Sequence, residues 1–222
     1  MSKRHEISKK LAEYDNARRE EYGPLLLGCD DSGRGAFAGP LAIGAVILPK
    51  DCEIEGLNDS KKLNEETRIK LTEQIKKAAV AWSVKFVHAP EIDAKGLTWA
   101  NTQATKQACI ECFKKIHKPT VDIFVADNTM YFPYKPAIVI PKGDSTSLTV
   151  AAASVLAKTL RDAYMVELSE QYPEYGWSDS KGYINEIHKE AVRQHGIIKG
   201  IHRESFKVSG INRPQQITLL DL

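Results

Sequence analysis

The sequence predicts an α/β protein in which one mixed β-sheet is flanked by helices. Three apolar, strand-like segments lie before residue 90, and strand-like and helix-like segments alternate after it. Such alternation is typical of domains in which parallel strands are joined through helices. Of the 222 residues, 42% are hydrophobic, which is an ordinary share for a globular protein with a buried core.

The strands are expected where short apolar runs lie between turn-forming residues. The first run, Leu25 to Asp30, ends in a glycine-rich turn (residues 33–40), and a second apolar run follows directly. In the third, apolar side chains occupy every second position from Val80 to Phe86, as in a half-buried strand. The expected strands cover residues 25–30, 41–48, 79–87, 121–126 and 137–140.

The helices are expected from apolar spacing and from end signals. Over residues 6–20, apolar side chains recur at helical spacing, and Gly23-Pro24 ends that segment. Asn64 is a suitable N-cap for a second helix, with acidic residues in its first turn. The remaining expected helices cover residues 97–116, 146–170 and 185–195.

Charge, cysteine content and hydropathy exclude several classes of protein. A net charge of +2 does not by itself indicate nucleic-acid binding, so a protein of this kind has to place basic residues around an acidic centre. No apolar run approaches the ~18 residues of a membrane span, and the N-terminus does not resemble a secretory signal. Four cysteines in a chain of this length are not a disulfide framework, which predicts a cytoplasmic protein.

Four aspartates are candidates for a metal site. Asp30 and Asp31 end the first strand, Asp127 ends another, and Asp162 lies within an Ala-rich helix. Carboxylates in apolar surroundings destabilise the fold unless a cation lies between them. Mg²⁺ is such a cation, and it prefers carboxylate and phosphate oxygens. Converging carboxylates can hold two such ions, which clamp both oxygens of a phosphoryl displacement. Each aspartate also has a simpler explanation, as a turn former at a strand end or as a solvated helix charge.

The turn after the first strand is a candidate ligand loop. Its closely spaced glycines allow the backbone to approach a ligand, and Arg34 adds a planar donor suited to phosphate. No Gly-Lys-Ser/Thr ends the turn and G-x-G-x-x-G does not fit, so it is neither a P-loop nor a dinucleotide fingerprint. A plain connection between two strands explains the same composition equally well.

With these residues in order, the sequence resembles the bacterial ribonuclease HII family, over roughly residues 25–206. The matching motifs are Asp30-Asp31-Ser-Gly-Arg-Gly35, Leu57-Asn-Asp-Ser-Lys-Lys-Leu63, Asp127, Lys142-Gly-Asp144, Ala151-Ala-Ala-Ser-Val-Leu-Ala-Lys158, Arg161-Asp162, Lys181-Gly-Tyr183 and His202-Arg-Glu-Ser-Phe206.

The resemblance implies an RNase H-like fold with a C-terminal helical extension, within a catalytic domain at residues 23–209. An N-terminal helical segment (1–22) would precede this domain and a polar tail (210–222) would follow it. The resemblance also implies a nuclease that depends on Mg²⁺ or Mn²⁺ and hydrolyses the RNA strand of RNA–DNA hybrids. The enzyme would also incise 5′ to single ribonucleotides in duplex DNA, as in ribonucleotide excision repair, and leave 3′-hydroxyl and 5′-phosphate ends.

The same resemblance assigns roles to particular residues. Asp30, Asp31, Asp127 and Asp162 would be the catalytic metal ligands. Gly33, Arg34 and Gly35 would contact the ribose 2′-hydroxyl, and Tyr183 would stack on the next sugar. Five basic residues would contact phosphates, namely Lys61, Lys142, Lys158, Lys181 and Arg203. For any single lysine among them, a solvated surface charge is an equally good explanation.

One departure from the family motif affects the expected chemistry. The family's second acidic residue is Glu, whereas Asp31 is shorter by one C–C bond, about 1.5 Å. We expect activity with an altered metal preference; a hybrid-binding protein with weak catalysis is the alternative. A different nuclease or an integrase on the same fold is a third alternative, against which the glycine–arginine turn and Tyr183 argue.

Two other signals have competing explanations. Gln216, Leu219 and Leu220 lie in a tail that resembles the peptides with which bacterial replication and repair proteins bind the sliding clamp. Packing of the two leucines on the core would explain them too. Cys109 and Cys112 have C-x-x-C spacing but no second pair, so we expect neither a zinc site nor a redox motif.

Overall fold

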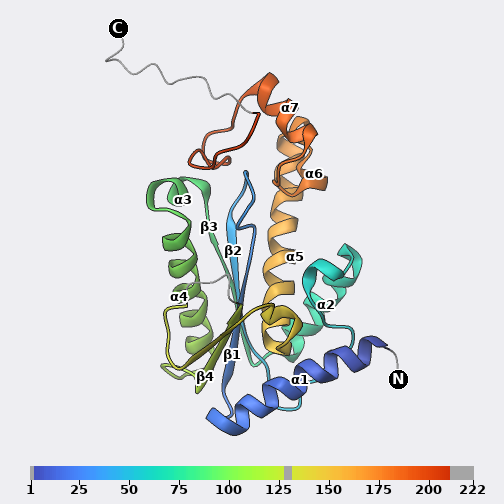
Figure 1. The fold of residues 1–222 in the computed structure, drawn as a ribbon, viewed down its shortest axis with the longest axis vertical. Coiled ribbons are helices and arrows are strands. Elements are labelled where there is room, and N and C mark those ends of the chain that lie inside the picture. Colours follow the sequence, from blue (N-terminus) through green and yellow to red (C-terminus); the bar gives the residue numbers. More distant parts are fainter. Residues whose placement is uncertain (1–2, 128–131, 211–222) are drawn as a thin grey trace.

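The computed structural model describes residues 3–127 and 132–210 and contains one five-stranded mixed sheet. Its strands are β1 (Leu26–Ser32), β2 (Leu41–Ile47), β3 (Ala81–Val87), β4 (Ile123–Asp127) and β5 (Ala137–Ile140). The order across the sheet is β3-β2-β1-β4-β5 (Figure 1). β2 pairs antiparallel with β1 and β3, whereas β4 pairs parallel with β1 and β5. The predicted mixed sheet is therefore confirmed.

The helices include two short ones that the sequence pattern did not predict. The helices are α1 (Lys3–Tyr22), α2 (Glu65–Ala78), α3 (Ala89–Lys95), α4 (Leu97–Ile116), α5 (Leu148–Gln171), α6 (Trp177–Ser180) and α7 (Glu186–His195). Single 3-10 turns are η1 (Ser60–Lys62), η2 (Gly143–Ser145) and η3 (Pro173–Tyr175). α3 and α6 are too short for a periodic pattern; α3 starts with a proline in its first turn and is separated from α4 by Gly96 at φ 85°. No helix in the described ranges combines the length and the apolar character that a membrane span requires.

The two longest core helices lie on opposite faces of the sheet. α4 packs on one face, whereas α5 packs on the other with α2 beside it (Figure 1). α5 approaches the strands closely, because a Cβ added to Gly28 would lie 2.6 Å from the carbonyl carbon of Thr149. At Gly44 the corresponding distance, to the carbonyl oxygen of Ala153, is 2.3 Å. The two glycines therefore allow α5 to pack closely on β2 and on β1, the strand that carries Asp30 and Asp31.

The C-terminal part of the chain forms the predicted helical extension. α6, α7 and the loop after them pack at the C-terminal end of α5, and α1 crosses near its N-terminal end (Figure 1). Trp177 and Tyr175 of the extension pack in one hydrophobic cluster with Phe37. Phe37 belongs to the glycine-rich turn between β1 and β2, so the extension is packed directly against this turn.

Candidate active site

Two of the predicted aspartates meet because their strands are parallel neighbours. Cys29 of β1 pairs with Ala126 of β4, and the next residue in each strand is an aspartate, Asp30 and Asp127. The carboxyl ends of parallel strands share one edge of a sheet, which is where ligands bind in open α/β folds. Both side chains are nearly buried, with 5% and 7% of their surface exposed.

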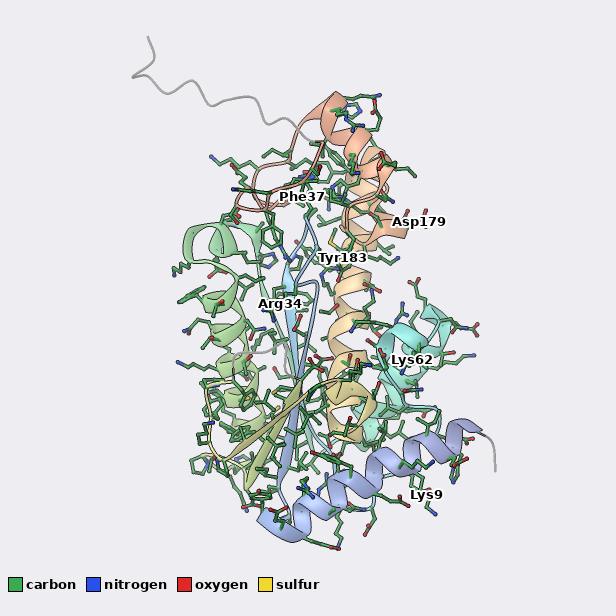
Figure 2. All side chains as sticks on the ribbon, in the orientation of Figure 1. Lys9, Arg34, Phe37, Lys62, Asp179 and Tyr183 are labelled. Atoms are coloured by element: carbon green, nitrogen blue, oxygen red, sulfur yellow. The ribbon has the colours of Figure 1, made fainter. Side chains whose placement is uncertain are left out.

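A cavity of about 480 Å³ lies at this edge of the sheet. Four aspartates line it, namely Asp30, Asp31, Asp127 and Asp144. The glycine turn, two lysines and one aromatic ring complete much of the wall, through Gly33, Arg34, Gly35, Lys61, Lys158 and Tyr183. Figure 2 shows Arg34 and Tyr183 near the middle of the molecule, where the sheet approaches the C-terminal extension. The wall of one cavity thus combines four carboxylates with the basic side chains of Arg34, Lys61 and Lys158.

Hydrogen bonds hold the carboxylates in place. One oxygen of Asp30 accepts from the backbone N–H of Asp31 at 2.8 Å, and Ser154 of α5 also donates to Asp30. Oδ2 of Asp127 accepts from the N–H of Gly143 at 2.8 Å. Because Gly143 begins η2, this bond also fixes the turn that carries Asp144.

The cluster is electrostatically unfavourable without a cation. Burial and the neighbouring Asp31 raise the pKa of Asp30 well above its usual value, and Asp127 adds to the effect. Burial and the adjacent Asp59 raise the pKa of Asp144 to about 6, although Lys61 opposes the shift from 3.9 Å. Buried carboxylates that repel one another become stable when a hard cation neutralises them. The donor set is therefore chemically suited to a divalent ion such as Mg²⁺ or Mn²⁺.

The cavity is not a closed protein cage for a metal. Within residues 3–127 and 132–210, no three acidic, histidine or cysteine side chains are grouped closely enough to hold an ion by themselves. Mg²⁺ is usually bound by one or two carboxylates together with water and substrate phosphates, not by an all-protein cage. An open acidic cavity of this kind fits an ion that arrives with, or is completed by, a phosphate-containing ligand.

Asp162 does not belong to the group with which it was predicted. It is 2% exposed and does not line the cavity. Its oxygens accept from Lys158 at 2.8 Å and from Arg68 at 3.3 Å. The fourth cavity aspartate is Asp144, for which the sequence pattern predicts no role. The available signal was its place in the Lys142-Gly-Asp144 motif, just after a strand.

The glycine turn is held against α5 by a buried arginine. Arg161 is fully buried and donates to the carbonyls of Ala38, Pro40 and Lys181 at 2.9–3.2 Å. Gly33 lies at φ 83°, and a Cβ there would come within 1.9 Å of Nε of Arg161, so only glycine fits. The same guanidinium lies 5.4 Å from the ring centre of Tyr183. One side chain thus links the turn to the tyrosine across the cavity wall.

The five predicted phosphate contacts divide into two groups. Lys61 and Lys158 line the cavity, whereas the exposed Lys142 lies outside its wall. Lys181 is 9% exposed, lies 3.8 Å from Glu65 and donates to the carbonyl of Ser178.

Arg203 does not have the surface position that a phosphate contact needs. It has no exposed surface and donates to the carbonyls of Gly39 and Arg34 at 2.9–3.1 Å. In this structure Arg203 holds the glycine turn in place, and it does not have the exposed position predicted for a phosphate contact.

The two cysteines with C-x-x-C spacing do not line the cavity. Cys109 and Cys112 are fully buried in α4 and pack in the core. The tail residues Gln216, Leu219 and Leu220 lie outside the described residues.

Comparison with known proteins identifies the family. A family model described as Ribonuclease HII matches residues 27–209. The Ribonuclease HII of Parabacteroides distasonis is 42% identical over 201 residues, which cover 90% of this chain and 96% of that protein. The chain belongs to the ribonuclease HII family. A Ribonuclease HII of Bacillus cereus is 39% identical over 197 residues, which cover 89% of this chain and 74% of that protein.

Solved structures share the fold of this ribonuclease HII. The ribonuclease H2 of Pyrococcus horikoshii has a TM-score of 0.65 at 24% identity, covering 82% of this chain and 94% of that chain. Bst-RNase HIII in complex with Mn²⁺ has a TM-score of 0.63 at 18% identity, covering 82% of this chain and 67% of that chain. These structural similarities establish the RNase H-like fold. Membership of the ribonuclease HII family makes the protein a ribonuclease H, an endonuclease for RNA–DNA hybrids.

Proposed function

We propose that this ribonuclease HII incises duplex DNA on the 5′ side of single embedded ribonucleotides, as well as the RNA strand of hybrids. Divalent ions, Mg²⁺ or Mn²⁺, would be held by Asp30, Asp31, Asp127 and Asp144. The observation that carries the proposal is the common cavity of these carboxylates with the glycine turn and Tyr183.

The glycine turn is suited to distinguishing ribose from deoxyribose. Arg34 and Gly35 are exposed in the cavity. Apart from Gly35 and its two chain neighbours, no described residue has a heavy atom within 4 Å of the position that a Cβ on Gly35 would occupy. A sugar can therefore approach this backbone closely. The 2′-hydroxyl both donates and accepts hydrogen bonds, and it is the group by which proteins distinguish RNA from DNA. Tyr183, 39% exposed, offers a flat surface for the neighbouring sugar.

The two cavity lysines are placed to bind the phosphate backbone. Lys61 and Lys158 line the same cavity as the four aspartates, so a nucleic acid strand bound there would meet both the lysines and the carboxylates. Contacts from lysine to phosphate give affinity and register without base specificity. A divalent ion bound to the carboxylates would supply activation of water and stabilisation of the departing 3′ oxygen.

Cleavage of three labelled duplexes tests this function. The substrates are all-DNA, DNA with one ribonucleotide, and a full RNA–DNA hybrid, each with Mg²⁺, with Mn²⁺ and with chelator. We expect cleavage of the second and third only, lost with chelator, and a cut 5′ to the single ribonucleotide with a 3′-hydroxyl end. Cleavage of the all-DNA duplex, or full activity in chelator, would contradict the proposal.

A hybrid-binding protein with weak catalysis is a second candidate, which the short side chain of Asp31 favours. A displacement of about 1 Å at a reacting centre can cost on the order of 10²-fold in rate. Our preferred expectation is that the protein cleaves and that Asp31→Glu changes its relative rates with Mg²⁺ and Mn²⁺. Rates of wild type and variant on the single-ribonucleotide duplex, over a series of both metals, test this. Identical metal profiles would remove Asp31 as a determinant of metal preference.

We also propose that the tail binds the sliding clamp through Gln216, Leu219 and Leu220. The first support is the sequence resemblance of the tail to clamp-binding peptides. The second is a solved structure described as the PCNA:RNase HII complex from Archaeoglobus fulgidus. Its similarity to this chain has a TM-score of 0.60 at 24% identity and covers 89% of this chain and 100% of that chain. Removing residues 214–222 should weaken clamp binding at least tenfold, a loss of about 1.4 kcal/mol, while cleavage of naked duplex stays unchanged. Unchanged clamp affinity would refute the proposal.

A further inference from the structure

Three polar residues of α5 form a row along one side of the helix towards the cavity. Ser154, Lys158 and Asp162 are spaced four residues apart, so their side chains lie one above another on the helix surface. Ser154 donates to Asp30, Lys158 lines the cavity, and Asp162 lies beyond them, away from the cavity wall. A carboxylate as deeply buried as that of Asp162 is costly unless cations and hydrogen bonds compensate it.

The negative charge of Asp162 is balanced by two cationic side chains, which lie on different helices. Oδ1 accepts from Nζ of Lys158 at 2.8 Å, and Oδ2 accepts from a terminal nitrogen of Arg68 at 3.3 Å. The side chains of both cations are largely shielded, with 21% and 11% of their surface exposed. Hydrogen bonds between charged groups in such shielded positions are stronger and better oriented than those at the surface.

Arg68 joins Asp162 to the turn that carries Lys61. Its other terminal nitrogen donates to the carbonyl of Leu63 at 2.6 Å and to that of Ser60 at 3.4 Å. These two residues flank Lys61 and Lys62 in the η1 segment. Ser60 also pairs with Ser154 of α5 at 2.9 Å between their hydroxyl oxygens. The η1 turn is therefore tied to α5 at two points, one of which depends on Asp162.

We propose that Asp162 is a positioning residue for substrate phosphates: it holds Lys158 directly, and Lys61 through Arg68, in the wall of the acidic cavity. This inference rests on the proposed function, because it concerns how the same cavity binds a duplex. A direct role as a metal ligand would leave two shielded cations without their carboxylate. Both oxygens of Asp162 are already engaged by those cations, which favours positioning.

The test compares Asp162→Asn with wild type in two binding measurements. Anisotropy in chelator, over a salt series, gives the affinity for a duplex with one ribonucleotide, and calorimetry gives the affinity for Mn²⁺. We expect about tenfold weaker duplex binding and a log–log salt slope smaller by about 1–2, since one or two phosphate contacts are lost. The affinity for Mn²⁺ should stay within about twofold. Glu170→Gln, an exposed charge change on the same helix, should alter neither.

Two further variants keep the inference testable if Asp162→Asn folds poorly. Lys158→Gln and Arg68→Gln should each weaken duplex binding and reduce the salt slope. Combining Asp162→Asn with Lys158→Gln should cost less than the product of the two single effects, because both remove the same contact. Wild-type duplex affinity and salt slope in Asp162→Asn would overturn the inference, as would loss of Mn²⁺ binding with unchanged duplex affinity. A wild type that binds the duplex but does not cleave it would instead count against the proposed function.

Discussion

Asp144 is the cavity carboxylate whose replacement tests the proposed metal site at the scale of a single residue. It is 5% exposed, is held by the η2 turn next to Asp127, and has a pKa raised to about 6 by burial and by the adjacent Asp59. A buried carboxylate among others destabilises the fold when it is charged, so its presence requires a functional reason. The proposed metal site would provide that reason.

Replacing Asp144 should therefore lower the cleavage activity without lowering the stability of the fold. We expect Asp144→Asn to lower cleavage of a single-ribonucleotide duplex by about 100-fold or more, a size that loss of geometry at a reacting centre explains. Its melting temperature without metal should be equal to or above that of wild type at pH 7, because one repelling charge is removed. Gel assays and thermal melts measure both quantities. A clearly lower melting temperature with retained cleavage would assign Asp144 a purely structural role.

The aspartates also show how far single residues can be interpreted from sequence. Asp30 and Asp127 could be predicted together, because each ends an apolar strand. Asp162 could not be placed, since its partner Arg68 is 94 residues away and nothing in the pattern connects them. Arg203 lies in a polar segment that suggests exposure, and its burial depends on carbonyls of the distant glycine turn. Hydrophobic patterning places strands and helices, but it does not specify which polar groups meet between them.

At the scale of elements, α1 is bound to the start of α5 through one carboxylate. Asp15 is 1% exposed and accepts from the Ser147 hydroxyl at 2.6 Å and from the Thr149 N–H and hydroxyl at 2.8 and 2.6 Å. Ser147 is itself the N-cap of α5. An acidic group at a helix N-terminus stabilises the helix through its free N–H groups and dipole. Asp15 therefore anchors α1 beside the segment that leads from η2 into α5.

Asp15→Ala should lower the free energy of unfolding by about 2–3 kcal/mol, since it leaves buried donors without an acceptor. Urea unfolding followed by circular dichroism measures this change. Glu13→Ala is the matched control, because Glu13 is exposed on the same helix, and it should change stability by less than about 0.5 kcal/mol. Equal losses in the two variants would show that Asp15 makes no special contribution.

At the scale of the whole molecule, the C-terminal extension is joined to the site through buried polar groups. His188 and His202 are fully buried, with their Nε2 atoms 3.1 Å apart, and Trp177 donates to Nε2 of His188 at 3.2 Å. Nδ1 of His202 accepts from the N–H of Ile198, which leaves its Nε2 as the donor to His188. Nδ1 of His188 lies 3.1 Å from the carbonyl of Tyr183 and donates to it. Both rings are therefore neutral in this network, which ends at the tyrosine of the cavity.

This network predicts a loss of stability in acid. Burial and the neighbouring His188 lower the pKa of His202 from 6.5 to about 4. A base with a lowered folded-state pKa is protonated first in the unfolded chain, so its contribution is complete above pH 6.5 and is lost as the pH falls towards 4. At pH 5 the loss should be about 2 kcal/mol. Urea unfolding of wild type and His202→Gln at pH 7 and pH 5 tests this, and an equal pH effect in both proteins would contradict it.

The proposed chemistry requires the four cavity aspartates to bind divalent metal, and anomalous scattering from Mn²⁺ in crystals of this protein would locate the bound ions. We predict manganese peaks within the cavity, bonded to carboxylate oxygens of Asp127 and Asp144, and none at Asp162. Manganese bound at Asp162, or a cavity without manganese at saturating concentration, would contradict it.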